Sequence, residues 1–438
     1  GRAHGRLRRG CQPMETRAPA ATDAPQHDHA NRSIRSYDLH MWIERQIASR
    51  LERLAATRPV LVLTGARQTG KTALIRRLFH AHHYVSLDLP SEAAQAQQDP
   101  AAFLERHPLP LVVDEVQYAP ELFRHLKSVV DGDRQTRGQL ILTGSQPFGL
   151  MQGVAESLAG RAAVVQLEGL CSAEVTAAQP GLPLSERLLR GGYPELIADT
   201  AIDATEYFAS YVATYLERDL RSQLQISNLG DFERFLRAIA LRSAQLLNRA
   251  ELARDVGISN STAGIWLGLL QRSGLVVLLE PWLSNATKRL VKAAKLYVAD
   301  TGLLAFLVGL RSSQELLASP LAGAIWETQV VMDLRRQAAA VGDPLTLHFW
   351  RDRSKEVDLL VHRGGRFWLA DAKWSELPSS SDARRLPQVA GELGPDRVAS
   401  QALICRTANR YRLHNGVEAL PLEQASQWLE LRPAAPRG

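Results

Sequence analysis

The sequence predicts an α/β fold in which a parallel sheet is followed by a helical region and a second, smaller α/β domain. Short continuous apolar runs such as Val60–Leu63 and Leu111–Val113 end in a turn residue or in acids, which is typical of buried parallel strands. Apolar residues recur at helical spacing between residues 185 and 247. Beyond residue 313, one helical stretch precedes four further runs typical of strands.

The composition is that of a globular protein with several domains. Of 438 residues, 45% are hydrophobic and 22% are charged, and a domain takes about 100–200 residues. The three cysteines are far apart and lack CxxC spacing, which excludes a disulfide framework and a cysteine-rich zinc site. They favour a reducing compartment, so we expect a cytoplasmic protein. No run of about 18 apolar residues predicts a membrane span.

The charge is moderately basic. Lys and Arg number 52 against 46 Asp and Glu, giving a net charge of +6, and the isoelectric point is about 9.3. This balance permits a nucleic-acid partner without establishing one.

Both ends of the chain are predicted to be tails. Residues 1–40 lack apolar periodicity, and their scattered histidines are more typical of a disordered tail than of a metal site. Residues 431–438 are predicted to form a second tail. Met14 and Met41 are both possible starts, no secretory signal is expected, and folding is expected to begin near Met41.

The first apolar run leads into the sequence GxxxxGK[ST] of a phosphate-binding loop and then into a helix. The loop residues are Gly65, Ala66, Arg67, Gln68, Thr69, Gly70, Lys71 and Thr72. Its glycines allow backbone N–H groups to surround phosphate oxygens, and the helix N-terminus adds the positive end of its dipole. We expect Lys71 to reach the β- and γ-phosphates of ATP and Thr72 to bind Mg²⁺. The alternative is a simple glycine turn between two elements.

Acidic residues at the end of the second apolar run complete the expected site. Asp114 is predicted to hold Mg²⁺, directly or through water, and Glu115 to orient or deprotonate the attacking water. A third run beginning at Gln139 ends at Ser145 or Gln146, either of which is predicted to sense the γ-phosphate, with turn chemistry as the alternative. The sequence therefore predicts an ATPase rather than a protein that only binds ATP.

With these residues the sequence resembles the AAA-type ATP-binding protein family of bacteria and archaea that carries an uncharacterised conserved C-terminal domain. The resemblance covers about residues 41 to 430 and is carried by GARQTGKT, VVDEVQYAP, LILTGSQ, SLAGR, Gly191–Glu195, Tyr215–Leu220, Lys295–Leu303, Trp326-Glu327, Glu356–Asp358 and Ala370–Trp374. It implies a P-loop NTPase fold that binds and hydrolyses ATP.

The likeness to the AAA superfamily also implies a homo-oligomer in which an arginine of one subunit completes the site of the next. Arg161 and Arg218 match family motif positions and are candidates for this arginine finger. A structural salt bridge is the alternative for each.

The region after the ATPase domain is predicted to contain a helical lid at residues 185–247 and a winged helix-turn-helix at residues 248–312. Tyr207, Tyr211, Val212, Tyr215 and Leu216 form an apolar stripe that we interpret as core of the lid. The second block contains a helix, a glycine turn, a Ser/Asn/Thr cap, a second helix and a strand, which is the order of a winged helix.

The predicted winged helix gives a weak indication of DNA binding. The early residues of its second helix are Asn260, Ser261 and Thr262, none of them basic, whereas Lys288, Arg289, Lys292 and Lys295 lie in or after the wing. Contact with the DNA backbone is therefore more consistent with the sequence than base readout. A structural or protein-binding role is the alternative.

The last domain, residues 313–430, contains the spacing Glu327 … Asp358 … Asp371-Ala372-Lys373, which resembles the PD-(D/E)xK nuclease fold, a restriction-endonuclease-like α/β domain. In that chemistry the carboxylates bind Mg²⁺ and the lysine assists the attacking water. Strand alternation places Asp371 and Lys373 on one face. A second metal site is thus predicted, with a degenerate domain used for binding or assembly as the alternative.

Two functions fit this organisation, in which residues 41–184 form the ATPase domain. The first is an ATPase that acts on nucleic acid or on a nucleoprotein partner. The second is a signalling or toxin-type switch, in which ATP controls assembly and the C-terminal domain binds partners without cleaving nucleic acid.

Overall fold

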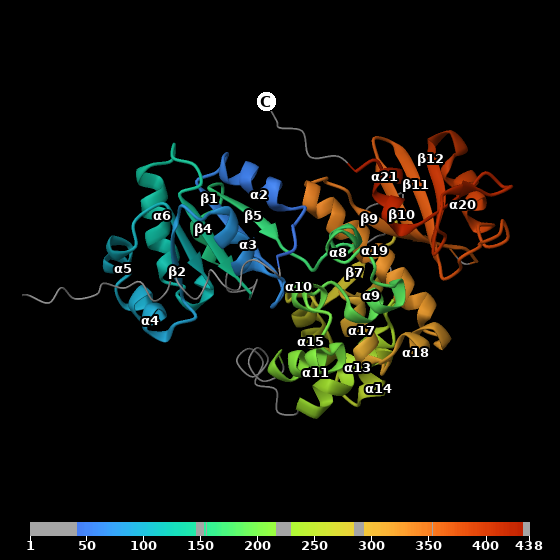
Figure 1. The fold of residues 1–438 in the computed structure, drawn as a ribbon, viewed down its shortest axis with the longest axis horizontal. Coiled ribbons are helices and arrows are strands. Elements are labelled where there is room, and N and C mark those ends of the chain that lie inside the picture. Colours follow the sequence, from blue (N-terminus) through green and yellow to red (C-terminus); the bar gives the residue numbers. More distant parts are fainter. Residues whose placement is uncertain are drawn as a thin grey trace, which may run out of the picture. The chain divides into compact units, whose positions relative to one another are not determined.

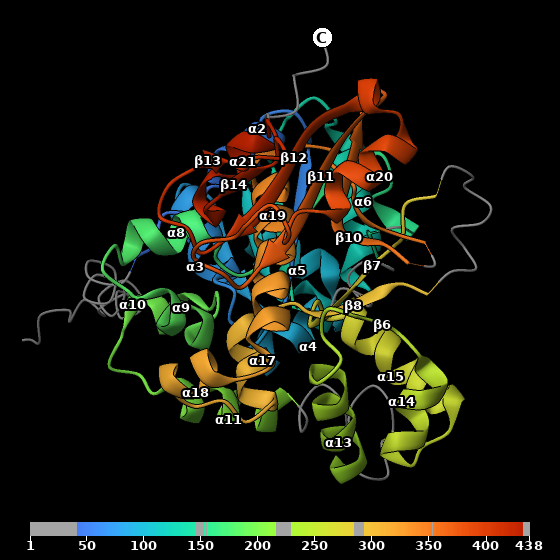
Figure 2. The same cartoon turned by 90° about the vertical axis from the view of Figure 1, so that its right-hand side faces the viewer.

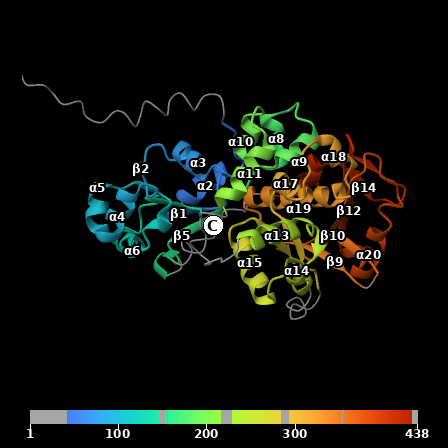
Figure 3. The same cartoon turned by 90° about the horizontal axis from the view of Figure 1, so that it is seen from below.

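The computed structural model describes residues 42–145, 153–154, 156–215, 229–283, 293–352 and 354–431. Its strands form three sheets, which Figures 1, 2 and 3 show from three directions in the colours of the sequence. Within these ranges, no helix combines the length and the apolarity needed to span a bilayer.

The first sheet is parallel and has the strand order β2-β3-β4-β1-β5. Its strands are β1 (Val60–Thr64), β2 (His83–Ser86), β3 (Leu111–Asp114), β4 (Leu140–Gly144) and β5 (Ala162–Gln166). All residues of β1, β3 and β4 are buried, as their apolar runs predict. Because parallel strands share a direction, the residues that follow β1, β3 and β4 lie together at the carboxyl ends of the strands.

Helices cover both faces of this sheet. They are α2 (Ala48–Ala55), α3 (Lys71–Leu78), α4 (Pro90–Gln98), α5 (Pro100–Arg106) and α6 (Leu122–Gly132), whereas α8 (Ser172–Ala178) follows β5 in the chain. On one face, Phe103 and Phe123 pack with Val62 of β1 and Val113 of β3 in a single core. Helices α2 and α3 contact each other and the sheet through β1 and β4.

The middle of the chain is helical, with one small antiparallel sheet of order β6-β8-β7. Its elements are α9 (Leu184–Arg190), α10 (Pro194–Ala198), α11 (Ala204–Tyr215), α13 (Leu229–Ala240), β6 (Gln245–Leu246), α14 (Arg249–Val256), α15 (Asn260–Arg272), β7 (Val276–Leu279), β8 (Lys295–Val298), α17 (Thr301–Leu307) and α18 (Ser313–Ala318). Helices α13, α14 and α15 pack together (Figure 3), with Phe232, Phe235 and Trp266 in their core.

The local sequence explains the boundary between α14 and α15. The side chain of Asn248 caps α14, and Gly257 ends it in the left-handed conformation with φ 81°. The side chain of Ser259 then accepts a hydrogen bond from the Thr262 backbone and caps α15. The predicted order of helix, glycine turn, helix and strand is therefore observed.

The C-terminal part is a six-stranded sheet of order β13-β14-β12-β11-β10-β9 with helices on both faces. Its elements are α19 (Ala322–Val341), β9 (Leu347–Arg351), β10 (Glu356–Arg363), β11 (Arg366–Lys373), α20 (Arg385–Leu393), β12 (Val398–Cys405), β13 (Tyr411–Arg412), β14 (Glu418–Leu420) and α21 (Ala425–Trp428). Helix α19 contacts β11 (Figure 2), and Trp326 of α19 packs in the core on that face.

The strands predicted from apolar runs are confirmed in both larger sheets. Strands β2, β5, β6, β8, β13 and β14 were not predicted from apolar runs. Strand β5 could not be recognised as a buried run, because four of its five residues, AAVVQ, are at least partly accessible to solvent. The predicted tail at residues 1–40 lies outside the described residues.

Candidate functional site

The phosphate-binding loop connects β1 to α3 at the carboxyl edge of the parallel sheet. Gly65 has φ 148°, and a Cβ there would lie 2.1 Å from the Leu167 carbonyl oxygen, so the loop approaches the chain after β5 too closely for any side chain. Gly70 has φ 87° and precedes α3 as its N-cap. The two motif glycines thus have backbone reasons to be present.

The ammonium of Lys71 is buried and turns back on the loop. Its Nζ donates hydrogen bonds to the carbonyl oxygens of Gly65 at 3.1 Å and Ala66 at 2.9 Å. Burial lowers the pKa of Lys71, although the charges of Glu115 and Asp114 act in the opposite direction. A phosphate oxygen carries more negative charge than these carbonyls, so an incoming nucleotide offers Lys71 a stronger partner.

Asp114, at the end of β3, receives three hydroxyl groups. Thr72 and Tyr84 donate to its Oδ2 at 2.7 and 2.8 Å, and Thr143 donates to Oδ1. Hydroxyl and carboxylate oxygens are the ligands that Mg²⁺ takes alongside water and nucleotide phosphates. Thr72 and Asp114 therefore fit the predicted magnesium site, while Tyr84 and Thr143 were not foreseen.

Glu115 follows in the left-handed conformation, with φ 56°, which directs its side chain away from the strand. Both carboxylate oxygens accept from the Ser145 hydroxyl, at 2.6 and 2.7 Å, and one also accepts from the Ser145 backbone N–H and the Gln117 amide. Burial would raise the pKa of Glu115, but these hydrogen bonds and Lys71 lower it below its ordinary value. This environment favours the ionised carboxylate, which is the form that the predicted role as a base requires.

An open cavity of about 700 Å³ brings several of the predicted residues together. It is lined by Arg67, Gln68, Gly70, Lys71, Thr72, Ala73, Glu115, Ser145, Tyr211 and Thr214. The last two belong to α11, and the Tyr207 hydroxyl of the same helix donates to the Gln68 side chain at 2.9 Å. Tyr207 and Tyr211 of the predicted stripe therefore also face the phosphate-binding loop, whereas Leu216 lies outside the described residues.

Arg45 holds the phosphate-binding loop through the Thr69 carbonyl oxygen, a role that the sequence did not predict. Its guanidinium donates to the Thr69 carbonyl oxygen at 2.9 Å and to the Glu168 carbonyl oxygen at 2.8 Å. It also pairs with Glu174 at 3.3 Å, and both side chains are nearly inaccessible to solvent. Arginine is common on surfaces, so only the fold reveals this one as buried.

The two arginine-finger candidates have different outcomes. Arg161 makes a bidentate pair with Asp131, at 2.7 and 2.9 Å, and this pair lowers the pKa of Asp131 to about 2. It precedes β5 and so lies at the amino ends of the parallel strands, whereas the phosphate-binding loop of its own chain lies at their carboxyl ends. Arg218 lies outside the described residues, as do Gln146, Lys288, Arg289 and Lys292.

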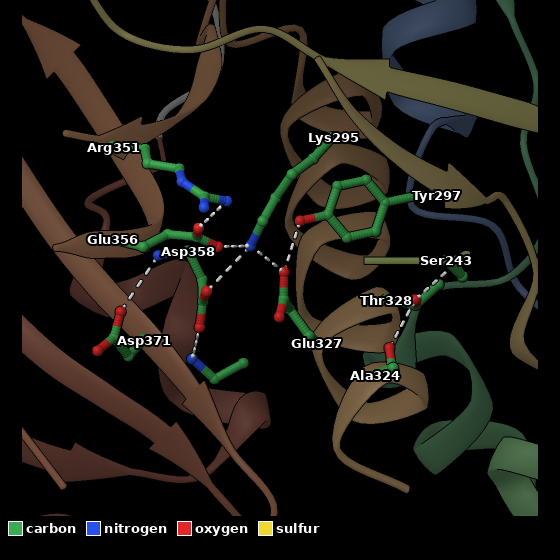
Figure 4. A network of polar contacts seen from close by, with 11 residues as sticks. Ser243, Lys295, Tyr297, Ala324, Glu327, Thr328, Arg351, Glu356, Asp358 and Asp371 are labelled. Carbon is green, nitrogen blue, oxygen red and sulfur yellow. Dashed lines mark hydrogen bonds and ion pairs between the residues drawn. The ribbon is translucent and has the colours of Figure 1, made fainter. Parts of the chain in front are cut away.

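A second polar cluster lies in the C-terminal part and is shown in Figure 4. Glu327 of α19 and Asp358 of β10 both contact the ammonium of Lys295, at 2.8 and 3.1 Å, and Glu356 contacts it at 2.6 Å. The Tyr297 hydroxyl also donates to Glu327, at 2.7 Å. Lys295 was expected to be a basic residue of the wing region, and it is instead buried at the centre of three carboxylates.

Asp371 and Lys373 of the predicted nuclease-like site are placed differently. Lys373 ends β11 two residues after Asp371, and its charge acts to lower the pKa of Asp371. Asp371 accepts from the Asp358 backbone N–H at 3.1 Å. Burial and the Asp358 charge raise the pKa of Asp371 to about 7 and that of Glu327 to about 7. In the described ranges, no three His, Cys, Asp or Glu side chains are arranged to hold a metal ion. The geometry does not fit the predicted second metal site, because the ammonium of Lys295 lies between the carboxylates.

Three family models match successive parts of the chain. The first is described as an AAA domain and matches residues 57–176. The second and third are described as domains of unknown function, DUF8612 for residues 182–314 and DUF4143 for residues 322–425.

Two mycobacterial proteins are similar to this chain over most of its length. They are Uncharacterized protein Mb2031c of Mycobacterium bovis and Uncharacterized protein Rv2008c of Mycobacterium tuberculosis. Each is 34% identical over 390 residues, which are 88% of this chain and 85% of the relative.

Solved structures resemble the chain at lower identity. The Walker-type ATPase PABY2304 of Pyrococcus abyssi has a TM-score of 0.43 and 18% identity over 60% of this chain and 94% of its own. The RuvB Holliday junction branch migration motor of Thermotoga maritima has a TM-score of 0.29 and 17% identity over 54% of this chain and 89% of its own.

Proposed function

The chain belongs to the family of AAA-domain proteins that includes these two mycobacterial proteins, and we propose that it binds ATP with Mg²⁺ and hydrolyses it through Glu115. An AAA-type P-loop fold supports nucleotide binding and hydrolysis in general. The observation that carries the finer proposal is the ionised, oriented Glu115 carboxylate in the same cavity as Lys71 and Thr72.

The roles of the residues follow from their chemistry. Loop N–H groups and Lys71 hold the β- and γ-phosphates, and Thr72 with Asp114 holds Mg²⁺, which neutralises charge on the phosphate oxygens when bound. Glu115 orients a water molecule and takes its proton as the water oxygen bonds to the γ-phosphorus. The bond from that phosphorus to the bridging oxygen breaks, and ADP leaves with the electron pair.

The experiment that tests this function compares Lys71→Ala with Lys127→Ala, an exposed lysine of α6. Lys71→Ala removes the buried ammonium beside the phosphates, so we expect loss of ATP binding measured by calorimetry and loss of phosphate release. Lys127→Ala should match the parent in both. Unchanged ATP binding in Lys71→Ala would contradict the proposed site.

We propose that the partner is a nucleic acid, which the protein contacts through the phosphates. We also propose that the protein acts as a homo-oligomer. Support comes from the basic net charge of +6 and from α14, α15 and the β7–β8 pair, whose order is that of a winged helix. Arg249 bonds the Asn260 side chain at 2.9 Å near the start of α15. An ATPase assay with and without DNA tests this proposal. DNA should raise the rate of ATP hydrolysis at low salt, and this increase should become smaller as the salt concentration rises.

The second candidate function is a switch whose C-terminal domain binds partners without cleaving nucleic acid. One observation favours it over nuclease activity, namely the ammonium that neutralises the carboxylates of the nuclease-like domain. If DNA neither binds at low salt nor alters ATP hydrolysis, this candidate replaces the first.

A further inference from the structure

Lys295 reaches the carboxylate cluster from a different sheet. It is the first residue of β8, in the three-stranded sheet, whereas Glu327 lies on α19 and Glu356 and Asp358 lie on β10 of the six-stranded sheet. Figure 4 shows the lysine extending from its strand toward the helix on one side and toward β10 on the other. The cluster therefore connects elements that are far apart in sequence.

The ammonium is fully satisfied by this arrangement. A lysine has three N–H donors, and three carboxylates from three residues lie between 2.6 and 3.1 Å of Nζ. The side chain of Lys295 is 3% exposed, so water contributes little. Burial alone would lower the pKa of Lys295, but the three carboxylates raise it above its ordinary value, so the group is charged.

Neighbouring residues hold the cluster in place. Tyr297, two residues along β8 and on the same face, donates to the Glu327 oxygen that Lys295 also contacts. The Ala372 backbone N–H donates to Asp358 at 3.1 Å, and Arg351 pairs with the other oxygen of Glu356 at 3.0 Å. The apolar core beside it also joins the two sheets, through Tyr297, Leu279, Val331, Met332 and Phe349.

A divalent ion does not fit among these carboxylates while the lysine is present. Mg²⁺ and Mn²⁺ need several oxygen ligands around one point, and here that point is taken by a cationic nitrogen. A second cation beside the ammonium would be repelled by its positive charge. The resemblance to metal-dependent nucleases therefore extends to the carboxylates but not to the metal.

We propose that the ammonium of Lys295 is the resident cation of the Glu327, Glu356 and Asp358 cluster. It takes the position that a divalent ion would need and fastens the three-stranded sheet to the C-terminal sheet. The intact chain consequently binds no divalent ion at this cluster. This proposal does not depend on ATP hydrolysis, since its residues lie outside the nucleotide cavity.

The test is Mn²⁺ binding to the full-length chain, followed by electron paramagnetic resonance without nucleotide. In the parent, Asp358→Asn should leave the number of bound Mn²⁺ ions unchanged. Lys295→Ala should gain one site per chain, because three carboxylates lose their cation, and adding Asp358→Asn to it should abolish the gained site. Lys355→Ala, which removes a lysine paired with Glu392 elsewhere in the same domain, should gain nothing.

Two results would overturn the proposal. One is a Mn²⁺ site in the parent that Asp358→Asn removes, and the other is a folded Lys295→Ala protein that gains no site.

A second measurement decides the matter if Lys295→Ala fails to fold. Lys295→Met leaves three buried carboxylates without their cation and should lower the thermal midpoint. Adding Glu327→Gln removes one of those charges and should recover part of the loss. A double variant no more stable than Lys295→Met alone would refute the role of Lys295 as the counter-ion.

Discussion

At the scale of single residues, the environment of Glu115 matters most for the chemistry. Its carboxylate is buried, which alone would raise its pKa, and the hydrogen bonds from Ser145 and Gln117 reverse that effect. We therefore propose that Ser145 acts by orienting Glu115, which is a more specific role than the sensor predicted from its position after a strand.

Ser145→Ala should move the acid limb of the pH–rate profile for ATP hydrolysis to higher pH. The hydroxyl stabilises the ionised carboxylate, so its loss raises the pKa of Glu115 and leaves less of the base ionised under mildly acidic conditions. ATP binding should change little. Ser128→Ala, on the exposed face of α6, serves as the control, and an unmoved acid limb in Ser145→Ala would contradict this role.

The roles of residues inside a local sequence motif could be predicted. The roles of residues that reach the site only through the pairing of strands could not. Lys71, Thr72, Asp114 and Glu115 follow from local sequence. The structure places Lys71, Thr72 and Glu115 in one cavity, and Asp114 accepts a hydrogen bond from the Thr72 hydroxyl. Tyr84 reaches Asp114 only because β2 pairs with β3. Nothing in the sequence around Tyr84 indicates that pairing.

At the scale of elements, buried polar residues connect segments that the sequence keeps apart. Gly191 and Gly192 precede α10, and a Cβ at Gly191 would lie 2.0 Å from the Asp300 carboxylate, which accepts from the Gly192 N–H at 2.7 Å. Asp300 also caps α17. On α19, Asp333 accepts from Ser172 of α8, and Arg336 donates to the Leu170 carbonyl oxygen. The helical period of α19 was predicted, but which of its polar residues would be buried was not.

Arg45→Ala should destabilise the chain by about 3 kcal/mol, because it leaves the buried Glu174 without its cation. It should also raise the KM for ATP, since the Thr69 carbonyl loses its support. Urea unfolding and steady-state kinetics measure the two effects. Arg53→Ala, an exposed position of α2, should show neither, and a stable Arg45→Ala with parental KM would refute the support.

At the scale of the whole molecule, the position of Arg161 bears on assembly. It lies at the amino end of β5, whereas the nucleotide cavity lies at the carboxyl ends of the strands, so it cannot reach the site of its own chain. Its pairing with Asp131 is the structural alternative considered from sequence. If Arg161 is an arginine finger, it therefore acts on a neighbouring subunit of the proposed homo-oligomer.

Arg161→Ala should lower ATP turnover and leave ATP binding nearly unchanged. Mixing it with Glu115→Gln should restore some activity, because a site with intact Glu115 can then meet a subunit with intact Arg161. Phosphate release at a series of mixing ratios provides the readout. Rates that never exceed the sum of the separate variants would exclude Arg161 as the arginine supplied in trans, and a monomer with full activity would exclude any such arginine.

The architecture was predictable where strands are buried and continuous, as in β1, β3, β4, β10 and β11. It was not predictable where a strand is short or half exposed, as in β5 and β14, because such segments lack an apolar run. The cluster around Lys295 was least predictable. Its carboxylates suggest a metal site when read alone, and only the packing of β8 against α19 and β10 supplies the cation.

The measurement that tests the central claim most directly is single-turnover ATP hydrolysis by Glu115→Gln, with ATP affinity determined on the same sample. Glutamine keeps the shape of the side chain but cannot take a proton. We expect ATP affinity near that of the parent and a hydrolysis rate lower by about 100-fold or more. Hydrolysis at the parental rate would contradict the assignment of Glu115 as the base.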